Sequence, residues 1–245
     1  MDIYPAIDLK GGKCVRLVQG QFDDVTTYSD DPVQMAERWR TAGAKWLHVV
    51  DLDGARTGDN ANIEVVRSIV SEIGLPVQFG GGMRSAEAVE RMLNMGVARV
   101  VIGTAASENP EFAAEMFRRH GSSIAVGVDA KEGFVAVHGW QTTSAEPATD
   151  FVVRMAGLGA QRFIFTDIAR DGMLQGVNTL ALEQVAAVVP GIPVIASGGV
   201  ATIDDIIALV AMHGGSSPNV DGVIVGKALY AGTVTLEDVL QKAAV

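Results

Sequence analysis

The 245-residue sequence contains one cysteine, Cys14, no long apolar run and no cluster of basic residues. A single thiol cannot form an internal disulfide, and four scattered histidines without HxH or HExxH spacing predict no metal site. No apolar stretch approaches the roughly 18 residues of a membrane span, and the start lacks the features of a secretory leader. Lys and Arg number 19 against 29 Asp and Glu, a net charge of −10, which argues against nucleic-acid or membrane binding. We therefore expect a cytoplasmic protein with neither kind of partner.

Glycine is plentiful, with 28 residues gathered in short clusters such as 80–82 and 198–199. Such clusters indicate tight turns and sites where a ligand approaches the backbone closely. Hydrophobic residues make up 48% of the chain, enough for a substantial core. The length alone allows either one large domain or two of about 120 residues.

Short β-rich segments alternate with segments of helical periodicity eight times along the chain. The expected strands are 3–7, 46–50, 77–79, 98–102, 124–128, 162–166, 194–196 and 222–225. The expected helices are 32–42, 63–73, 86–95, 110–120, 148–158, 180–189, 203–211 and 236–243. About 31 residues per unit favours a single-domain α/β fold over 1–245, a closed (βα)8 TIM barrel. An open doubly wound sheet is the alternative, but it normally has fewer strands and one dominant glycine-rich fingerprint, which is lacking here.

The two halves of the chain resemble each other. The segment 76–83 (PVQFGGGM) parallels 193–200 (PVIASGGV), and 100–105 (VVIGTA) parallels 223–228 (VIVGKA). A third pair relates residues 5–12 to 126–133, where an aspartate is followed two residues later by a lysine. The sequence therefore predicts two duplicated half-barrels of four βα units, approximately 1–121 and 122–245.

Acidic residues stand at the ends of expected strands, where barrel active sites are built. Asp8 ends the first strand and Asp129 the fifth, so their carboxylates should face each other across the barrel mouth. Such a pair suits acid and base roles, although an aspartate after a strand also serves commonly as a helix cap. Asp51, Thr166 and Asp171 are further site candidates, with tight-turn chemistry as the alternative for Asp171.

Glycine-containing segments after the third, fourth, seventh and eighth strands predict phosphate binding, because backbone N–H groups can approach a phosphate there. Two opposed pairs of such segments indicate a long ligand with a phosphate at each end. Trp140 is expected either to stack on a planar base or to cover the mouth, and His48 is expected to be a packed strand histidine. The predicted substrate-binding residues are Gly81, Gly82, Arg84, Gly103, Thr104, Gly172, Gly198, Gly199, Gly226, Lys227, Asp51 and Trp140.

Seven segments of the chain carry a family resemblance that spans nearly its whole length. They are 5–12 (PAIDLKGG), 50–55 (VDLDGA), 80–84 (GGGMR), 127–129 (GVD), 139–140 (GW), 166–172 (TDIARDG) and 196–200 (ASGGV). With these segments the sequence resembles the isomerase family of histidine biosynthesis, which converts the phosphoribosyl aminoaldose ProFAR to the aminoketose PRFAR. The resemblance implies an Amadori rearrangement without a cofactor. It also implies Asp8 as proton acceptor and Asp129 as proton donor, assisted by Asp171 and Thr166, with Asp171 a competitor for the acid role.

Three alternatives remain open. The cyclase subunit of imidazole glycerol phosphate synthase is similar but differs in its first-strand segment and works with a glutaminase. A bifunctional isomerase would also accept phosphoribosyl anthranilate, and Gly80 and His138 stand where a serine and an arginine would be expected in it. A catalytically silent sensor would not need both Asp8 and Asp129. The chain is expected to act as a monomer on a small molecule with two terminal phosphates.

Overall fold

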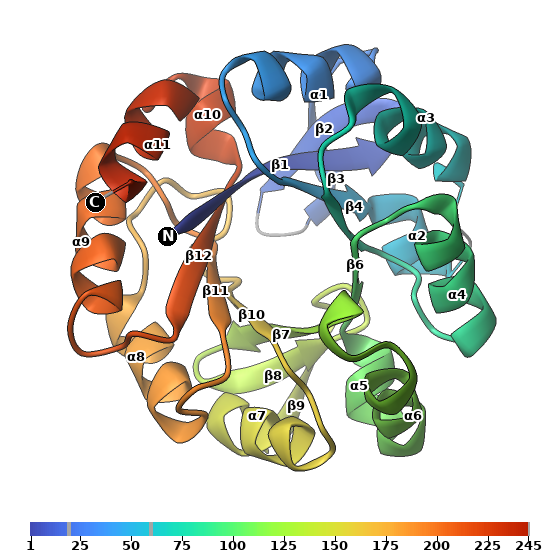
Figure 1. Ribbon diagram of the computed structural model, residues 1–245, viewed down its shortest axis with the longest axis vertical. Coiled ribbons are helices and arrows are strands. Elements are labelled where there is room, and N and C mark those ends of the chain that lie inside the picture. The colour runs from blue at the N-terminus through green and yellow to red at the C-terminus, as the bar shows by residue number, and fades with distance from the viewer. Residues whose placement is uncertain (19–20, 59–60, 245) are drawn as a thin grey trace.

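The computed structural model describes residues 1–18, 21–58 and 61–244, and it shows a ring of strands surrounded by helices (Figure 1). The strands of the ring are β1 (Asp2–Lys10), β4 (Leu47–Asp51), β5 (Val77–Gly80), β6 (Arg99–Ile102), β7 (Ile124–Lys131), β10 (Phe163–Asp167), β11 (Val194–Ser197) and β12 (Val220–Val225). Each pairs in parallel with the next, and β12 pairs with β1, so the sheet closes on itself. The predicted (βα)8 barrel is confirmed, and the open sheet is excluded.

A long helix follows each strand of the barrel before the next begins. These helices are α1 (Pro32–Thr41), α3 (Ile63–Ile73), α4 (Ala86–Met95), α6 (Pro110–His120), α7 (Ala148–Gly157), α8 (Thr179–Val188), α9 (Ile203–His213) and α11 (Leu236–Ala243). Their ends follow the local chemistry of the sequence. Asn109 caps α6 by accepting from the Phe112 N–H at 3.0 Å, and Thr202 forms a capping box with Asp205 at the start of α9.

Two hairpins and several short helices lie between the main elements, and of these the sequence had suggested only a short hairpin beyond the fifth strand, near Trp140. The hairpins are β2 (Lys13–Val18) with β3 (Gln21–Ser29), and β8 (Phe134–Val137) with β9 (Thr142–Pro147). The short helices are α2 (Leu52–Thr57), α5 (Thr104–Glu108), α10 (Lys227–Ala231) and the 3₁₀ turn η1 (Gly121–Ser123). One hairpin follows β1 and the other follows β7, so both extend from strands that carry a candidate catalytic aspartate two residues before their last residue.

The period-two alternation of the strands divides the core into two layers. In β1, Ile3, Ile7 and Leu9 face the surrounding helices, whereas Tyr4 and Ala6 face the barrel interior. The interior layer is small, and the larger layer fills the space between sheet and helices. The interior cluster consists of Tyr4, Ala6, Ala125, Ile164, Ile195 and Ile224.

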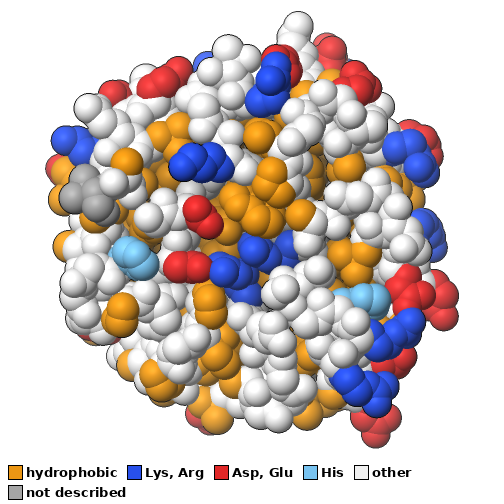
Figure 2. Space-filling model, viewed as in Figure 1, with side chains coloured by type: hydrophobic (Ala, Val, Ile, Leu, Met, Phe, Trp, Pro, Cys, Tyr) orange, Lys and Arg blue, Asp and Glu red, His pale blue; other side chains and the backbone are white. Residues whose placement is uncertain are grey.

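The end of the barrel at which β1 begins carries charged groups. Figure 2 shows Lys and Arg side chains gathered near the centre of the face seen in Figure 1, with acidic side chains beside them. Arg99 is the first residue of β6, and Arg162, directly before β10, forms an ion pair of 2.7 Å with Asp221. No helix of the described part of the chain is long and apolar enough to cross a membrane.

Candidate active site

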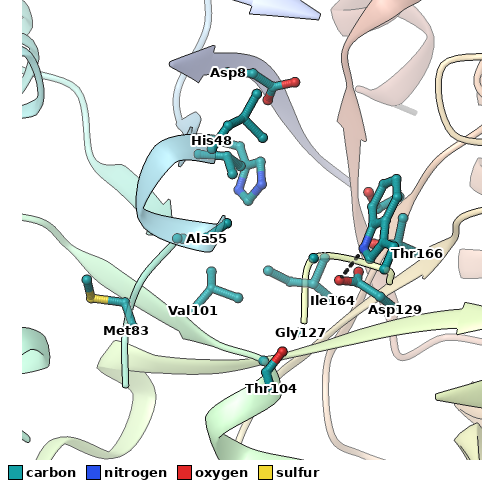
Figure 3. Close-up of a pocket in the computed structure, with 18 of the residues that line it drawn as sticks. Asp8, His48, Ala55, Met83, Val101, Thr104, Gly127, Asp129, Ile164 and Thr166 are labelled. Atoms are coloured by element: carbon teal, nitrogen blue, oxygen red, sulfur yellow. Dashed lines mark hydrogen bonds between the residues drawn. The ribbon is translucent and has the colours of Figure 1, made fainter. Parts of the chain in front are cut away.

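A pocket of about 240 Å³ opens at the carboxyl ends of the barrel strands. Side chains and backbone from the barrel strands form its wall, as expected for this fold. Asp8, Asp129, Asp171 and Thr166, the four predicted catalytic residues, all line this one pocket. Figure 3 shows Asp8 and Asp129 on different sides of the cavity, carried by β1 and β7.

Asp8 is held by an arginine that sequence reasoning missed. The Arg16 guanidinium donates from Nη1 to Asp8 Oδ2 at 2.7 Å, and the side chains are only 9% and 14% exposed, respectively. The contact forms because β2 folds back against β1, with Val15 opposite Asp8. Burial raises the pKa of Asp8 to about 6, with Arg16 opposing the rise and the carboxylate of Asp171 adding to it. The only sequence signal for Arg16 was a lone charge in the apolar run CVRLV.

Asp129 has different neighbours. The indole Nε1–H of Trp140 donates to its Oδ2 at 2.7 Å, and Thr166 on β10 also hydrogen-bonds its carboxyl group (Figure 3). Burial raises the pKa of Asp129, the two hydrogen bonds oppose the rise, and the charge of Asp171 adds to it. Trp140 lies between β8 and β9 with a φ of 71° and lines the pocket, so its N–H orients the carboxyl group. Sequence reasoning had not foreseen this contact.

Asp171 connects the main pocket to a smaller neighbouring cavity. It lines both, together with Arg16, Ser197 and Ile224. Burial raises the pKa of Asp171, whereas the charges of Arg16 and Lys227 and a backbone hydrogen bond lower it. Three carboxyl groups and two cations are thus electrostatically coupled within one site.

The predicted phosphate-binding residues fall into two groups at different places. The first group lines the main pocket and comprises Gly81, Gly82, Arg84, Gly103 and Thr104. The second lines the smaller cavity, of about 20 Å³, and comprises Gly172, Gly198, Gly199, Gly226 and Lys227. The two cavities share four lining residues, so the two groups line adjoining cavities.

Several of these glycines are required by the space around them. Gly198 has a φ of 84°, and a Cβ there would lie 2.8 Å from the Asp167 carbonyl oxygen. Gly81 has a φ of 108° and packs against the backbone of Asp51. A side chain at Gly226 would overlap the Arg16 guanidinium. Gly198 and Gly81 therefore allow two backbone segments to pack closely beside the cavities, and Gly226 leaves room for the arginine that pairs with Asp8.

Asp51 does not line the pocket, contrary to the sequence interpretation. Its side chain is fully buried, caps α2 by accepting from the Gly54 N–H at 2.9 Å, and accepts from Asn62 Nδ2 at 2.6 Å. Both of these bonds are to Oδ1, and the backbone N–H of Asn62 donates to Oδ2 at 3.2 Å. Both carboxylate oxygens are thus occupied within the protein, and Asp51 stabilises the loop after β4 without contacting the pocket. His48, by contrast, is packed as expected but also lines the pocket. Cys14 is buried and contacts the Tyr230 hydroxyl at 3.3 Å.

The sequence is similar to a well-defined set of proteins. A family model described as "Histidine biosynthesis protein" matches residues 2–235. A protein of Acetivibrio thermocellus is 49% identical over 243 residues, covering 99% of this chain and 100% of its own. A protein of Brevibacillus brevis is 48% identical, covering 98% of this chain and 95% of its own, and one of Moorella thermoacetica is 47% identical, covering 100% and 99%.

Each of these relatives is named as an imidazole-4-carboxamide isomerase whose substrate name contains a 5-phosphoribosyl and a 5-phosphoribosylamino group. The similarity extends over the complete barrel and over both halves of the candidate site. This chain therefore belongs to the histidine biosynthesis protein family.

Proposed function

We propose that this chain is an aldose–ketose isomerase of histidine biosynthesis, which rearranges the phosphoribosyl aminoaldose ProFAR to the aminoketose PRFAR. The observation that carries the proposal is the pair Asp8 and Asp129, two partly buried carboxyl groups in one pocket, with one set of glycines in the wall of that pocket and a second set in the cavity that adjoins it. The names of the full-length relatives support the same reaction.

The rearrangement needs one proton donor and one proton acceptor. The donor protonates the ribose ring oxygen, the C1′–O bond breaks, and an iminium forms between C1′ and the amine nitrogen. The acceptor removes the C2′ proton, and the resulting enolamine gains a proton at C1′ as the C2′ hydroxyl becomes the ketone. The iminium accepts the electron pair of the C2′–H bond, so the conversion is an isomerisation with no external oxidant.

The electrostatics support Asp8 as the acceptor and Asp129 as the donor. Arg16 pairs with Asp8, and a carboxyl pKa of about 6 leaves Asp8 mostly ionised at neutral pH. Asp129 is hydrogen-bonded by Trp140 and Thr166, which are neutral, and burial favours its protonated form. Asp171 faces the charges of Arg16 and Lys227, which favour its carboxylate and make it the poorer proton donor.

The two groups of predicted phosphate-binding residues suit the two phosphates. One lies at the loop that leads into α4 and is flanked by Arg84, whose guanidinium also donates to the Ala55 carbonyl at 2.8 Å. The other lies at the loop that leads into α9 and includes Lys227. Backbone N–H groups and these local cations would bind phosphates despite the net charge of −10. All these residues come from one chain, so a monomer suffices.

A turnover assay with two substrates tests the proposal. We expect the purified protein to isomerise the aminoaldose and to leave phosphoribosyl anthranilate unchanged. Turnover of both would establish the bifunctional isomerase instead. Turnover of neither would contradict the proposal, and an assay with the aminoketose and ammonia would then test the cyclase.

A further inference from the structure

The barrel interior contains a chain of polar side chains to which the acid–base mechanism assigns no role. At its base Arg99 is 8% exposed, and its guanidinium carbon lies 4.5 Å from the centre of the Trp46 ring. Arg99 Nη1 donates to Gln78 Oε1 at 2.9 Å and to the Tyr4 hydroxyl at 3.3 Å. Gln78 is fully buried, and its Nε2 lies 3.0 Å from His48 Nδ1. The chain thus leads from the base of the barrel to a histidine at the pocket.

The chemistry of the three side chains fixes the direction of every hydrogen bond in this chain. A guanidinium has donors only, so the Gln78 group that faces Arg99 must be the carbonyl oxygen. The Gln78 amide nitrogen then faces His48 and donates to it. Nδ1 of His48 must therefore be the unprotonated ring nitrogen, and a neutral imidazole carries its proton on Nε2.

The protonated nitrogen has no partner within the protein as described. No described residue hydrogen-bonds Nε2 of His48, and the imidazole lines the pocket that contains Asp8 and Asp129 (Figure 3). Burial and the nearby charge of Arg16 lower the pKa of His48 to about 3, so the ring stays neutral across the working pH range.

We propose that His48 donates an Nε2–H hydrogen bond to an oxygen of the substrate's sugar, and that Gln78 and Arg99 are positioning residues that fix the required tautomer. The sugar as partner rests on the proposed function, whereas the tautomer rests on the hydrogen-bond chain alone. His48 transfers no proton in this role. It holds the sugar between the two carboxyl groups that do.

Nitrogen-15 NMR of the four histidines tests the tautomer without any activity measurement. The signal of His48 is identified by its loss in His48→Gln. We expect Nε2 to be protonated and Nδ1 unprotonated, with no titration between pH 5 and 9. A protonated Nδ1, or a titration near pH 6.5, would overturn the proposal.

The variant Gln78→Glu tests the relay. A glutamate beside the Arg99 guanidinium is ionised and keeps an acceptor for Arg99, but the second oxygen of an ionised carboxylate can only accept, so Nδ1 of His48 must hold a proton to hydrogen-bond it. We expect the NMR signature to switch and kcat to fall about ten- to hundredfold, with little change in the thermal midpoint. If the folded variant instead keeps the wild-type NMR signature and the wild-type kcat, Gln78 does not position His48.

Substitution of His48 itself tests the donor. His48→Gln keeps an N–H group near the position of Nε2, whereas His48→Phe keeps the ring shape without a donor. We expect the phenylalanine variant to lose at least about tenfold more kcat/KM than the glutamine variant. The matched control is His213→Gln at the end of α9, outside the pocket, which should retain wild-type kinetics.

Equal activity of His48→Phe and wild type would overturn the donor role. A wild-type protein that shows the expected tautomer but does not isomerise the aminoaldose would instead contradict the proposed function. It would remove the sugar as the partner of His48 and leave the fixed tautomer established.

Discussion

Arg16 is the residue that most alters the interpretation of the site, because it determines when Asp8 is ionised. Its charge opposes the rise in pKa that burial imposes on Asp8, so removing it should raise that pKa above about 6. We expect the acid limb of the kcat/KM profile of Arg16→Met to move to higher pH, because the proton acceptor must be ionised. Profiles between pH 5 and 9 measure this shift. The control is Lys13→Met. Lys13 lies on β2, the strand that carries Arg16, but its ion pair with Asp30 is exposed, so this variant should leave the profile unchanged.

Asp8 is expected to act in chemistry more than in binding. Asn at this position keeps the shape and a hydrogen-bond acceptor for Arg16 but cannot take the C2′ proton. We expect Asp8→Asn to lower kcat by at least about a thousandfold and to leave ligand affinity within about tenfold. Steady-state kinetics and calorimetric titration with a substrate analogue measure the two effects, and retained turnover would remove Asp8 from the mechanism.

Asp129, the proposed proton donor, also affects the stability of the fold. A carboxyl group whose pKa is raised in the folded state destabilises the fold as pH rises from its unfolded pKa through its folded pKa. Asn cannot ionise and can still accept from Trp140. We expect Asp129→Asn to unfold at a higher temperature than wild type at pH 8, with the advantage lost below about pH 4. Melting curves across this range measure it. A less stable variant at pH 8 would mean that the donors from Trp140 and Thr166 outweigh burial.

At the scale of elements, the loop between β11 and α9 combines backbone crowding with the proposed binding of a phosphate. Gly198 has a φ of 84° and no room for a Cβ, whereas Gly191 has nearly the same φ, 83°, with nothing within 4 Å. Both alanine variants carry the cost of a left-handed backbone, about 1 kcal/mol. Gly198→Ala should lose about 1–3 kcal/mol more in the free energy of unfolding and weaken phosphate binding. Urea unfolding and phosphate titration test this; equal losses would show that the loop relaxes freely.

The main elements were predictable from the sequence because their signals are local. Pro32, Asn109 and the glycine stops mark helix ends, and the expected helix 63–73 coincides with α3. The first hairpin was not expected, because β2 and β3 lack clear alternation and their pairing contains register shifts. Its absence from the expectation is also why Arg16 was missed.

At the scale of the whole molecule, the two halves repeat their construction. Gly103 and Gly226 have φ and ψ values of −114° and −100°, and −112° and −98°, each directly before a five-residue helix. Asn62 donates to Asp51, and Asn178 donates to Asp167 at 2.7 Å, eleven residues apart in both cases. We propose on this basis that 1–121 and 122–245 are duplicated half-barrels.

The halves are nevertheless joined by continuous strand pairing. Val100 of β6 pairs with Ile124 of β7, and β12 closes on β1, so neither half has a sheet edge of its own that is free. We expect a single unfolding transition in urea. The fluorescence of Trp46, in a variant without the other tryptophans, and far-UV circular dichroism should give the same midpoint. Two separated midpoints would show that the halves unfold independently.

The sequence by itself determined the barrel, the positions of Asp8 and Asp129 near the carboxyl ends of their strands and the glycine loops, because residue periodicity and local turn chemistry encode these features. Tertiary structure decided which side chains meet. In the folded chain Arg16 pairs with Asp8, and Asp51 caps α2 and does not line the pocket. The hydrogen bonds from Arg99 to Gln78 and from Gln78 to His48 determine the proposed tautomer of His48. The Arg16–Asp8 pair and the His48–Gln78–Arg99 chain join residues on different strands, whose side chains meet only once those strands have paired. The cap formed by Asp51 is local, but Asn62, eleven residues further along the chain, holds the same carboxylate.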